Sequence, residues 1–478
     1  MLRRTKIVAT LGPATDDLEN LSKMIAAGVD IVRVNFSHGT KEEHEGRINA
    51  VRRCAKEHDR VVGILADMQG PKIRVARFAQ GFVELKSAQA FCLDADLAKE
   101  AGNDEAVGID YKDLPQDVHE GDTLLLDDGR IVMMVVSVVG NKINCEVVTG
   151  GKLSNNKGIN RLGGGLSAGA LTDKDRIDLQ IAADIDVDYV AISFPRSAKD
   201  MQEARELLDK AGGTSIGTVA KIERTEAVAN IDEIILASDA VMVARGDLSV
   251  EIGDAEVPAV QKHIIRRARF HNRPVITATQ MMESMIESSV PTRAEVSDVA
   301  NAVLDGTDAV MLSAETAVGK HPELVVAAVA RACLGVEKHP IATKGSSVPE
   351  QHFSRPDEAI AVATMYTANH LNITAIIALT ESGATPLWMS RIRTNIPVFG
   401  LSRLAKTRAK MSLFRGVYPL EFDVTILNRD EVNRSAVTEL EKRGFVKKGD
   451  LVIITKGDHM GILGGTNALK IVQVGEVI

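Results

Sequence analysis

Short apolar stretches rich in β-branched residues alternate with amphipathic stretches along the first part of the chain. This alternation is typical of βα units that build a parallel sheet. In one amphipathic stretch Leu21, Met24 and Ile25 recur at helical spacing, and Gly28 follows as a typical helix C-cap. Eight stretches are predicted to be strands: Lys6–Gly12, Asp30–Ser37, Val61–Met68, Tyr189–Phe194, Gly217–Glu223, Ala240–Leu248, Pro274–Met281 and Ala309–Glu315. Eight strands with their helices predict an α/β fold of the (β/α)8, or TIM, barrel type.

One connection between the predicted strands is too long for a single crossover. It runs from residue 72 to residue 168, between the third and the fourth strand, and contains the alternating apolar runs Ile131–Val138 and Ile143–Val148. Turn sequences flank these runs, which predicts hairpins and a small inserted β domain of barrel type. The return segment Gly150–Gly169 is rich in Gly and Asn, and we predict that it is a flexible hinge.

A second α/β pattern follows a linker-like segment, Pro340–Pro349. It predicts a helix at Glu358–Leu371 and five strands, near Ala375–Leu379, Pro397–Leu401, Val417–Phe422, Leu451–Thr455 and Lys470–Val474. We therefore expect a separate three-layer α/β domain. The predicted organisation is a barrel from residues 1–71 and 169–342, the insert at 72–168 and the C-terminal domain at 343–478.

Composition narrows the classes of function. The chain has 478 residues, 45% of them apolar, which is enough for several domains with buried cores. Its net charge of −8 and its 3% of aromatic residues argue against a nucleic-acid partner, and it has no apolar run long enough to span a membrane. The four cysteines are scattered without a CxxC pair, so reduced thiols and a cytoplasmic location are expected.

Polar residues gather where the predicted barrel strands end. The loops at the carboxyl ends of barrel strands converge on one mouth, so these side chains are the candidates for a site. They are Arg33, Asn35, Ser37, His38, Asp67, Lys221, Glu223, Asp247, Thr279, Gln280, Ser313 and Glu315.

The residue types in this group indicate phosphoryl transfer. Glu223 and Asp247, on neighbouring strands, suit a hard ion such as Mg²⁺ better than zinc. Lys221 lies two residues from Glu223 and so on the same side of a strand, where an ammonium can neutralise a transferring group or an enolate. Arg33, Arg74 and the Gly246 backbone add contacts for anions. A lone Lys-x-Glu pair is more often a solvated ion pair, and Gly163–Gly165 fits a hinge better than a phosphate loop.

Several motifs stand in the order in which they occur in one enzyme family. They are Asn35–Gly39, Gly70-Pro71, Lys221–Glu223, Met242–Leu248, Ala278–Met281, Pro291–Glu295, Asp305–Asp308 and Met311–Ser313. Along essentially its whole length the chain resembles pyruvate kinases, and among them the bacterial isozymes that respond to AMP or sugar monophosphates.

The resemblance implies Mg²⁺-dependent (or Mn²⁺-dependent) transfer of phosphate from phosphoenolpyruvate to ADP, giving pyruvate and ATP. Glu223 and Asp247 would bind the metal, and Lys221 would stabilise the phosphoryl group and the enolate. Thr279 and Ser313, with ordered water, would protonate the enolate. Phosphoenolpyruvate would contact Arg33, Lys221, Gly246, Asp247 and Thr279, and ADP would contact Asn35, Phe36, Ser37, His38 and Arg74. The insert resembles the family's lid, which excludes water.

One segment departs from the pattern of many family members. Where they read Asp-Thr-Lys-Gly-Pro-Glu and require K⁺, this chain reads Asp67-Met-Gln-Gly-Pro-Lys72. Met68 removes an oxygen ligand and Lys72 brings a positive charge. Our hypothesis is that the Lys72 ammonium replaces K⁺, so that Asn35, Ser37 and Asp67 are remnants of a monovalent site and K⁺ is not required.

The last domain resembles the family's regulatory domain. Thr380, Ser382, Gly383 and Thr385 follow a predicted strand and open a helix, an arrangement that suits a phosphate, and Thr455–Asp458 closes another strand nearby. Two ordinary βα turns are the alternative. Ala384 stands where the family often has Arg, which weakens the case for fructose 1,6-bisphosphate. The resemblance implies a phosphorylated allosteric effector and a homotetramer.

Two other functions remain open at the level of sequence. A barrel lyase or aldolase that handles phosphoenolpyruvate or pyruvate would use the same metal and carboxylates to hold an enolate. A catalytically silent sensor would bind metabolites through its last domain. The insert with Arg74, together with His38, argues against the first alternative, and the joint presence of Lys221, Glu223, Asp247 and Thr279 argues against the second.

Overall fold

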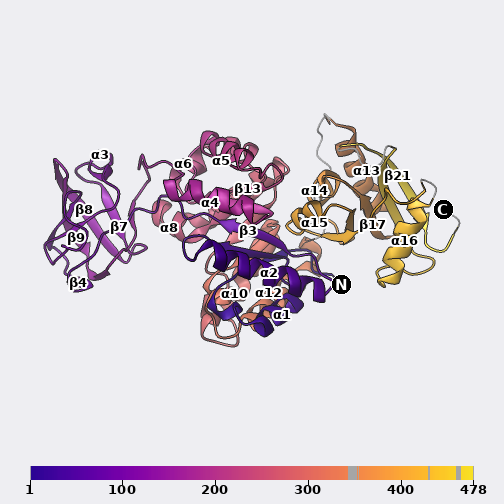
Figure 1. Ribbon diagram of the computed structural model, residues 1–478, viewed down its shortest axis with the longest axis horizontal. Helices are drawn as coiled ribbons and strands as arrows, with labels where there is room; N and C mark the ends of the chain where they lie inside the picture. Colours follow the sequence, from indigo (N-terminus) through magenta and orange to yellow (C-terminus); the bar gives the residue numbers. More distant parts are fainter. Residues whose placement is uncertain (1, 343–352, 354, 429–430, 459–463, 477–478) are drawn as a thin grey trace.

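Three parts of the chain lie in a row along the longest axis of the molecule (Figure 1). The computed structural model describes residues 2–342, 353, 355–428, 431–458 and 464–476. The insert, which we define as residues 68–172, between strand β3 and helix α4 (Asp173–Asp184), forms one end, a barrel lies in the middle and the C-terminal domain forms the other end.

The central part is a closed barrel of eight parallel strands, in the order β1-β16-β15-β14-β13-β12-β3-β2. Its strands are β1 (Lys6–Thr10), β2 (Ile31–Asn35), β3 (Gly63–Asp67), β12 (Tyr189–Ile192), β13 (Gly217–Ile222), β14 (Ala240–Ala244), β15 (Val275–Ala278) and β16 (Ala309–Leu312). The eight predicted strands and the barrel type are confirmed, although the observed strands are shorter than predicted.

Helices follow each barrel strand and surround the barrel. They are α1 (Leu18–Ala27), α2 (Lys41–Glu57), α4 (Asp173–Asp184), α5 (Ala198–Lys210), α6 (Thr225–Ala229), α7 (Ile231–Leu236), α8 (Arg245–Ile252), α9 (Val257–Phe270), α10 (Arg293–Asp305), α11 (Ala314–Ala317) and α12 (Pro322–Glu337), with the short 3₁₀ turns η1 (Pro13–Thr15), η2 (Glu283–Ile286) and η3 (Pro340–Ala342). Gly28 is the predicted C-cap of α1, with φ of +121°, a conformation that favours glycine.

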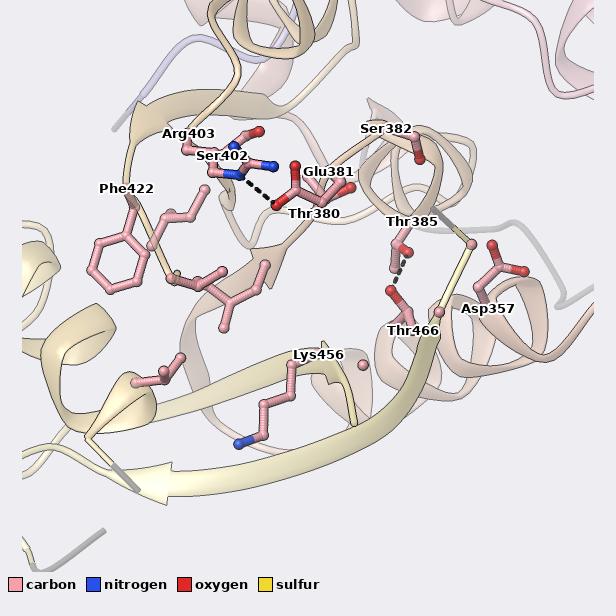
Figure 2. Close-up of a pocket in the computed structure, with 17 residues that line it drawn as sticks. Asp357, Thr380, Glu381, Ser382, Thr385, Ser402, Arg403, Phe422, Lys456 and Thr466 are labelled. Atoms are coloured by element: carbon pink, nitrogen blue, oxygen red, sulfur yellow. Dashed lines mark hydrogen bonds and ion pairs between the residues drawn. The ribbon is translucent and has the colours of Figure 1, made fainter. Parts of the chain in front are cut away.

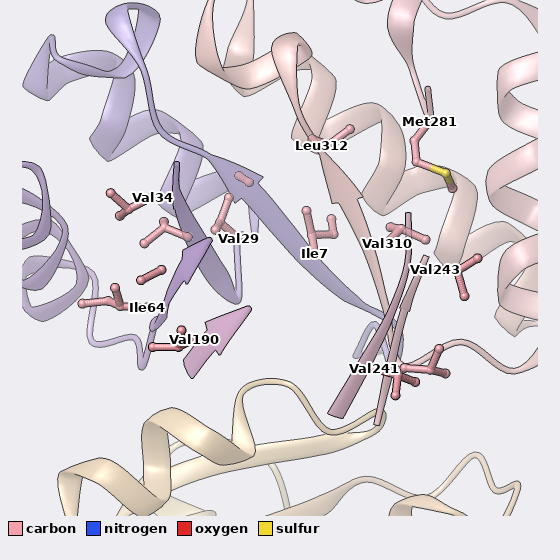
Figure 3. Packing of buried hydrophobic residues seen from close by; sticks show 14 of the residues in the cluster. Ile7, Val29, Val34, Ile64, Val190, Val241, Val243, Met281, Val310 and Leu312 are labelled. Carbon is pink, nitrogen blue, oxygen red and sulfur yellow. The ribbon is translucent and has the colours of Figure 1, made fainter. Parts of the chain in front are cut away.

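Alternate residues of each barrel strand belong to two apolar layers. Ile7 and Ala9 pack with Leu21 and the other buried residues of the surrounding helices (Figure 3). Val8, between them, belongs to the barrel interior, which is filled by one such residue or more from every strand. Because the strands are apolar on both faces, polar chemistry is confined to the ends of the barrel.

The insert contains two sheets, in which all neighbouring strands are antiparallel except β5 and β6, which are parallel. A two-stranded sheet pairs β10 (Gly151–Ser154) with β4 (Phe82–Leu85). A six-stranded sheet has the order β11-β7-β8-β9-β5-β6. Its strands are β11 (Ile159–Arg161), β7 (Thr123–Leu126), β8 (Ile131–Val139), β9 (Lys142–Thr149), β5 (Ala90–Asp94) and β6 (Ala106–Gly108). The insert also contains the short helix α3 (Leu114–Asp117).

The prediction that all of Gly150–Gly169 is a flexible hinge is wrong, because β10 and β11 lie within it. Both strands pair with segments more than 30 residues away, and composition carries no information about such pairing. Gly163, Gly164 and Gly165, which follow β11, all have positive φ. At this point the chain does take the conformations that only glycine adopts readily.

The C-terminal domain is a sheet covered by helices, in the order β19-β18-β17-β20-β21, with only β21 antiparallel to its neighbour. The strands are β17 (Ile373–Leu379), β18 (Val398–Ser402), β19 (Val417–Glu421), β20 (Leu451–Gly457) and β21 (Thr466–Gln473), and the helices are α13 (Pro356–His370), α14 (Ala384–Ser390), α15 (Ala405–Met411) and α16 (Val432–Lys442). This arrangement confirms the predicted α/β domain. The predicted linker Pro340–Pro349 lies mostly outside the described residues.

The C-terminal domain docks against the amino ends of the barrel strands. Tyr189, the first residue of β12, donates to Lys410 O over 2.9 Å, and Lys6, the first residue of β1, donates to Val417 O over 2.5 Å. Phe414 packs into the same apolar cluster as the barrel interior. The carboxyl ends of the strands therefore stay clear of this domain and face the side from which the insert emerges.

Candidate active site

The carboxyl ends of β3, β13 and β14 position three acidic side chains. Asp67 is the last residue of β3, and Glu223 directly follows β13, which also carries Lys221. The sequence predicted that Asp247 lies at the end of a strand, and this prediction is wrong. Strand β14 stops at Ala244, and Asp247 lies in the first turn of α8. The turn still places Asp247 close enough for its charge to act on Glu223 and Lys221.

Lys221 is the centre of a buried charge cluster. Its Nζ lies 3.0 Å from Glu223 Oε1 and 3.2 Å from Asp67 Oδ1, and it donates to Ser193 Oγ over 2.6 Å. Burial lowers the pKa of Lys221, but the Asp67 and Glu223 carboxylates outweigh that effect and raise the pKa above its ordinary value. The ammonium is therefore charged at any physiological pH.

Arg33 completes the pairing of Asp67. Its Nε donates to Asp67 Oδ2 over 2.6 Å, and its Nη1 donates to Thr10 Oγ1 over 3.2 Å. Burial raises the pKa of Asp67, but Lys221 and Arg33 outweigh it and hold the pKa below its ordinary range. Asp67 is thus fully used in holding two cations at the barrel mouth, by which we mean the carboxyl ends of the barrel strands.

Glu223 and Asp247 fit a divalent metal. Burial, reinforced by the charges of Asp247 and Asp67, raises the pKa of Glu223 to about 7 despite its contact with Lys221. Such crowding of carboxylates is relieved by a cation, and oxygen donors are what Mg²⁺ prefers. No cluster of three or more His, Cys, Asp or Glu side chains suited to a metal occurs among the described residues. Two carboxylates from the protein match a Mg²⁺ ion that shares its shell with a substrate phosphate.

A short loop after β15 holds Thr279 next to Gly246. The Gly246 N–H donates to Thr279 Oγ1 over 2.9 Å, and the Thr279 hydroxyl donates to Ala278 O over 2.6 Å. Thr279 has φ of +70° and Gln280 has φ of +53°, so two consecutive non-glycine residues occupy the left-handed region. This conformation costs about 1 kcal/mol or more per residue and needs support from its surroundings.

Arg245 provides that support. Its Nη2 donates to Thr279 O over 2.6 Å, its Nε donates to Ala278 O over 3.2 Å, and its Nη1 donates to Asp298 Oδ1 over 2.8 Å. The guanidinium thus ties the Thr279 loop to helix α10. Arg245 was not among the residues predicted from the sequence, although its position next to Gly246 and Asp247 was a signal. Ser193, which accepts from Lys221 and donates to Met68 O over 2.8 Å, was not predicted either.

Lys72 does not contact the predicted monovalent residues. Its Nζ lies 3.0 Å from Asp247 Oδ1 and 3.7 Å from Asp128 Oδ1 of the insert. Asn35 Oδ1 instead accepts the Ser37 N–H over 3.1 Å. Lys72 therefore joins the barrel mouth to the insert through two carboxylates.

The predicted nucleotide-binding residues are not all brought together. Phe36 is buried and stacks on His44 with ring centroids 4.3 Å apart, so its side chain is not available to a ligand. His38 is exposed, whereas Arg74 lies in the insert and donates to Asn156 O over 2.9 Å. Asn35 is the last residue of β2, and Ser37 follows in the next turn.

Ser313 is the N-cap residue of α11, next to the barrel mouth. Its N–H donates to Glu315 Oε2 over 2.6 Å, and the Met282 N–H donates to Glu315 Oε1 over 3.2 Å. Glu315 is therefore a structural link between the loops after β15 and β16, and the Ser313 hydroxyl is not used by it.

A second pocket lies in the C-terminal domain, far from the barrel mouth (Figures 1 and 2). Thr380, Ser382 and Thr385 line it, together with Arg403 and Lys456, the last of which comes from the predicted Thr455–Asp458 segment. Gly383 is the N-cap residue of α14, and its N–H donates to Thr380 Oγ1 over 2.9 Å. Thr385 Oγ1 donates to Thr466 Oγ1 over 2.9 Å.

The fold and the barrel mouth define a (β/α)8 barrel with a cationic centre beside two carboxylates that suit a divalent metal and a phosphorylated ligand. Comparison with known families agrees: residues 2–326 match the pyruvate kinase barrel domain and residues 358–472 match the pyruvate kinase alpha/beta domain. The chain belongs to the pyruvate kinase family.

Similar proteins cover almost the whole chain. Pyruvate kinase II of Salmonella typhimurium is 56% identical over 99% of both chains, and a pyruvate kinase of Haemophilus influenzae is 54% identical over 95% of this chain and 96% of its own. A crystal structure of a pyruvate kinase from Cryptosporidium parvum superposes with a TM-score of 0.91 at 34% identity, covering 98% of this chain and 96% of that chain.

Two further expectations can be compared with the structure. The four cysteines are all free, as predicted. Within the part of the chain that the structure describes, no helix combines the length and the apolar character needed to cross a bilayer.

We expect Arg245→Met to lower kcat/KM for phosphoenolpyruvate by about tenfold or more, because the Thr279 loop loses hydrogen bonds worth about 1–3 kcal/mol. Arg245→Lys should recover part of the loss, and KM for ADP should stay unchanged. Steady-state kinetics measure all three. Arg176→Met, which breaks an exposed pair with Glu203, is the matched control. A kcat/KM within twofold of wild type in Arg245→Met would contradict the positioning role.

Proposed function

We propose that the barrel mouth transfers the phosphoryl group of phosphoenolpyruvate to ADP, giving pyruvate and ATP. The observation that carries this proposal is the buried Lys221 ammonium, held within 3.2 Å of both Asp67 and Glu223 and next to Asp247. A fixed positive charge at this point can stabilise both the transferring group and the enolate that it leaves behind.

Each part of phosphoenolpyruvate has a matching group at the barrel mouth. Arg33 would hold the phosphate. The Gly246 N–H and the Thr279 hydroxyl, which here donate to Thr279 Oγ1 and Ala278 O over 2.9 Å and 2.6 Å, would turn to the carboxylate when the substrate binds, with the Asp247 backbone alongside. Glu223 and Asp247 would hold Mg²⁺ or Mn²⁺, which when bound neutralises phosphate charge. Thr279 and Ser313, with ordered water, would deliver the proton to the enolate.

The insert would close over ADP and exclude water, because hydrolysis competes with transfer. Arg74 lies in the insert and Asn35, Ser37 and His38 lie at the barrel mouth, so closure brings these nucleotide contacts together. Phe36 would contribute only its backbone. The Gly163–Gly165 segment, with its three left-handed glycines, is a suitable pivot.

We expect Lys221→Met to lower kcat by about 10³-fold, the range seen when a preorganised positive donor is removed. A lactate-dehydrogenase-coupled assay with phosphoenolpyruvate and ADP measures the rate. Lys23→Met, at an exposed lysine of α1 paired with Glu19, is the matched control and should be unaffected. Normal turnover by Lys221→Met would refute the mechanism, and an inactive wild-type enzyme would favour the lyase or the sensor.

The enzyme would not need K⁺, because the Lys72 ammonium supplies a positive charge beside Asp247 at the barrel mouth. What supports this is the Lys72 ammonium 3.0 Å from Asp247 Oδ1, and the use of Asp67 by Arg33 and Lys221 instead of by a monovalent ion. Asn35, Ser37 and Asp67 would be the remnants of a monovalent site.

We expect the wild-type rate to stay the same when tetramethylammonium replaces potassium. Lys72→Glu should become activated by K⁺ about tenfold or more, because it restores a carboxylate that attracts the ion. The coupled assay at constant ionic strength measures both rates, and Lys99→Glu, at an exposed residue of the insert, is the control. Strong activation of the wild type by K⁺ would reject the hypothesis.

The C-terminal pocket would bind a phosphorylated effector such as AMP or a sugar phosphate, which acts through a homotetramer. Hydroxyl groups of Thr380, Ser382 and Thr385 line the pocket, together with Lys456 and Arg403. Two acidic residues, Asp357 and Glu381, also line it, and Glu381 pairs with Arg403 over 3.2 Å. Hydroxyl and cationic groups are what a phosphate needs.

For the effector site we expect Lys456→Gln to raise the effector concentration for half-maximal activation about tenfold, since one charge-assisted contact is worth about 1.5–3 kcal/mol. The basal rate at saturating phosphoenolpyruvate should not change. Activity against AMP and a panel of sugar phosphates measures this, with exposed Lys447→Gln as control. Kinetics that no phosphorylated compound alters would remove the proposal.

A further inference from the structure

The seam between the barrel and the C-terminal domain contains an unusual concentration of arginines. A small cavity there is lined by four of them, Arg4, Arg269, Arg393 and Arg415. None of the described residues that line this cavity is acidic. The barrel mouth and the C-terminal effector pocket share none of these residues.

Two buried carboxylates near the cavity, Asp308 and Glu337, already accept several hydrogen bonds from their neighbours. Asp308 pairs with Arg391 through two hydrogen bonds, one of them 2.9 Å long, and also accepts the Arg415 backbone N–H over 3.0 Å. Glu337 accepts from the backbone N–H groups of Arg4 and Thr5 over 2.8 Å and 2.6 Å, and from the Thr5 hydroxyl over 2.7 Å.

The guanidinium groups bond mainly to backbone carbonyls. Arg415 Nη1 donates to Val303 O and Thr307 O, each over 3.0 Å, and Arg269 Nη1 donates to Gly306 O over 3.3 Å. Carbonyls satisfy N–H donors but do not neutralise charge. Asp308 and Glu337 attract the lining arginines, but Asp308 is shared with Arg391, so among the described residues the guanidinium groups here outnumber the carboxylates.

Arg4 provides a second observation. Its side chain is 4% exposed, and its Nε–H finds no hydrogen-bond acceptor among the described residues. The nearest carboxylate oxygen, Glu337 Oε2, lies 3.8 Å away. A buried donor of this kind costs about 1–3 kcal/mol unless a ligand accepts from it.

Mutual repulsion of the cluster is visible in Arg269. Burial, followed by the charges of Arg391, Arg415 and Arg393, lowers the pKa of Arg269 to about 9. Gly306, at φ of +97°, leaves room for Arg269, because a Cβ at this position would lie 3.2 Å from Arg269 Cδ. The fold thus places the Arg269 guanidinium next to other guanidinium groups, whose charges disfavour its protonated form.

We propose that this cavity is a binding site for a compact tetrahedral oxyanion, either inorganic phosphate or the head group of a phosphate monoester, held by Arg4, Arg269 and Arg415 with Arg393 at its edge. Guanidinium groups match phosphate oxygens in geometry and charge. The bound anion bridges α9 of the barrel to the C-terminal domain, so it strengthens their docking.

Thermal unfolding of the full chain tests the proposal. Phosphate, compared with chloride at equal ionic strength, should raise the unfolding midpoint in proportion to the logarithm of its concentration above Kd. Arg269→Gln should lose at least half of this rise. Arg266→Gln, at an exposed arginine on the same helix, should keep it. The difference between Arg269 and Gln at this position should persist in the Lys456→Gln background, where phosphate binding in the C-terminal pocket is weakened. An equal rise in Arg269→Gln and wild type would overturn the proposal.

Two further measurements keep the test independent of how well the variant folds. Wild-type crystals soaked in selenate should show an anomalous peak beside Arg4 and Arg269, and its absence would overturn the site. Glycerol 3-phosphate distinguishes the two sources of the anion. A rise in the unfolding midpoint equal to that with phosphate would assign the site to phosphate monoesters, whereas a rise with phosphate alone would assign it to the free ion.

Discussion

The site depends on one buried ionic contact, that of the Lys221 ammonium with Asp67 and Glu223. Both carboxylates are 1% exposed at the side chain, where an unpaired charge would cost several kcal/mol. The neighbouring groups are arranged around this constraint. Arg33 donates to the second oxygen of Asp67, the Phe194 N–H donates to Glu223 Oε2, and Ser193 accepts from Lys221. A charge held so completely cannot reorganise during the reaction, which is the condition for strong electrostatic catalysis.

The barrel makes that contact possible because the bodies of its strands are apolar and the residues at their carboxyl ends are polar. The register that pairs β2 with β3 sets Asn35 beside Asp67, and β13 beside β14 sets Lys221 near the start of α8. The C-terminal domain uses the opposite end of the same strands, where Tyr189 and Lys6 bond to its backbone. The candidate active site and the C-terminal domain thus lie at opposite ends of the same strands.

The sequence was sufficient where structure follows local periodicity, and insufficient where it follows contacts between distant residues. The eight strands and the cluster of Lys221, Glu223 and Asp67 could be predicted, since burial on both faces and position at a strand end are visible locally. Asp247 was assigned to a strand because the apolar run before it hides the start of α8. The partner of Lys72 lies 175 residues away, and the pairing of β10 with β4 is equally non-local, so neither had a local signal.

The two ends of the barrel carry an excess of charge of opposite sign. At the mouth, crowded carboxylates raise the pKa of Glu223 to about 7, and at the seam, burial and crowded guanidinium groups lower the pKa of Arg269 to about 9. Neither group of like charges stabilises the fold, because burying such charges together costs free energy. At the mouth we propose that a divalent cation supplies the compensating charge. The same reasoning, with the sign reversed, supports the proposed anion at the seam, where the buried Arg4 Nε–H has no acceptor among the described residues.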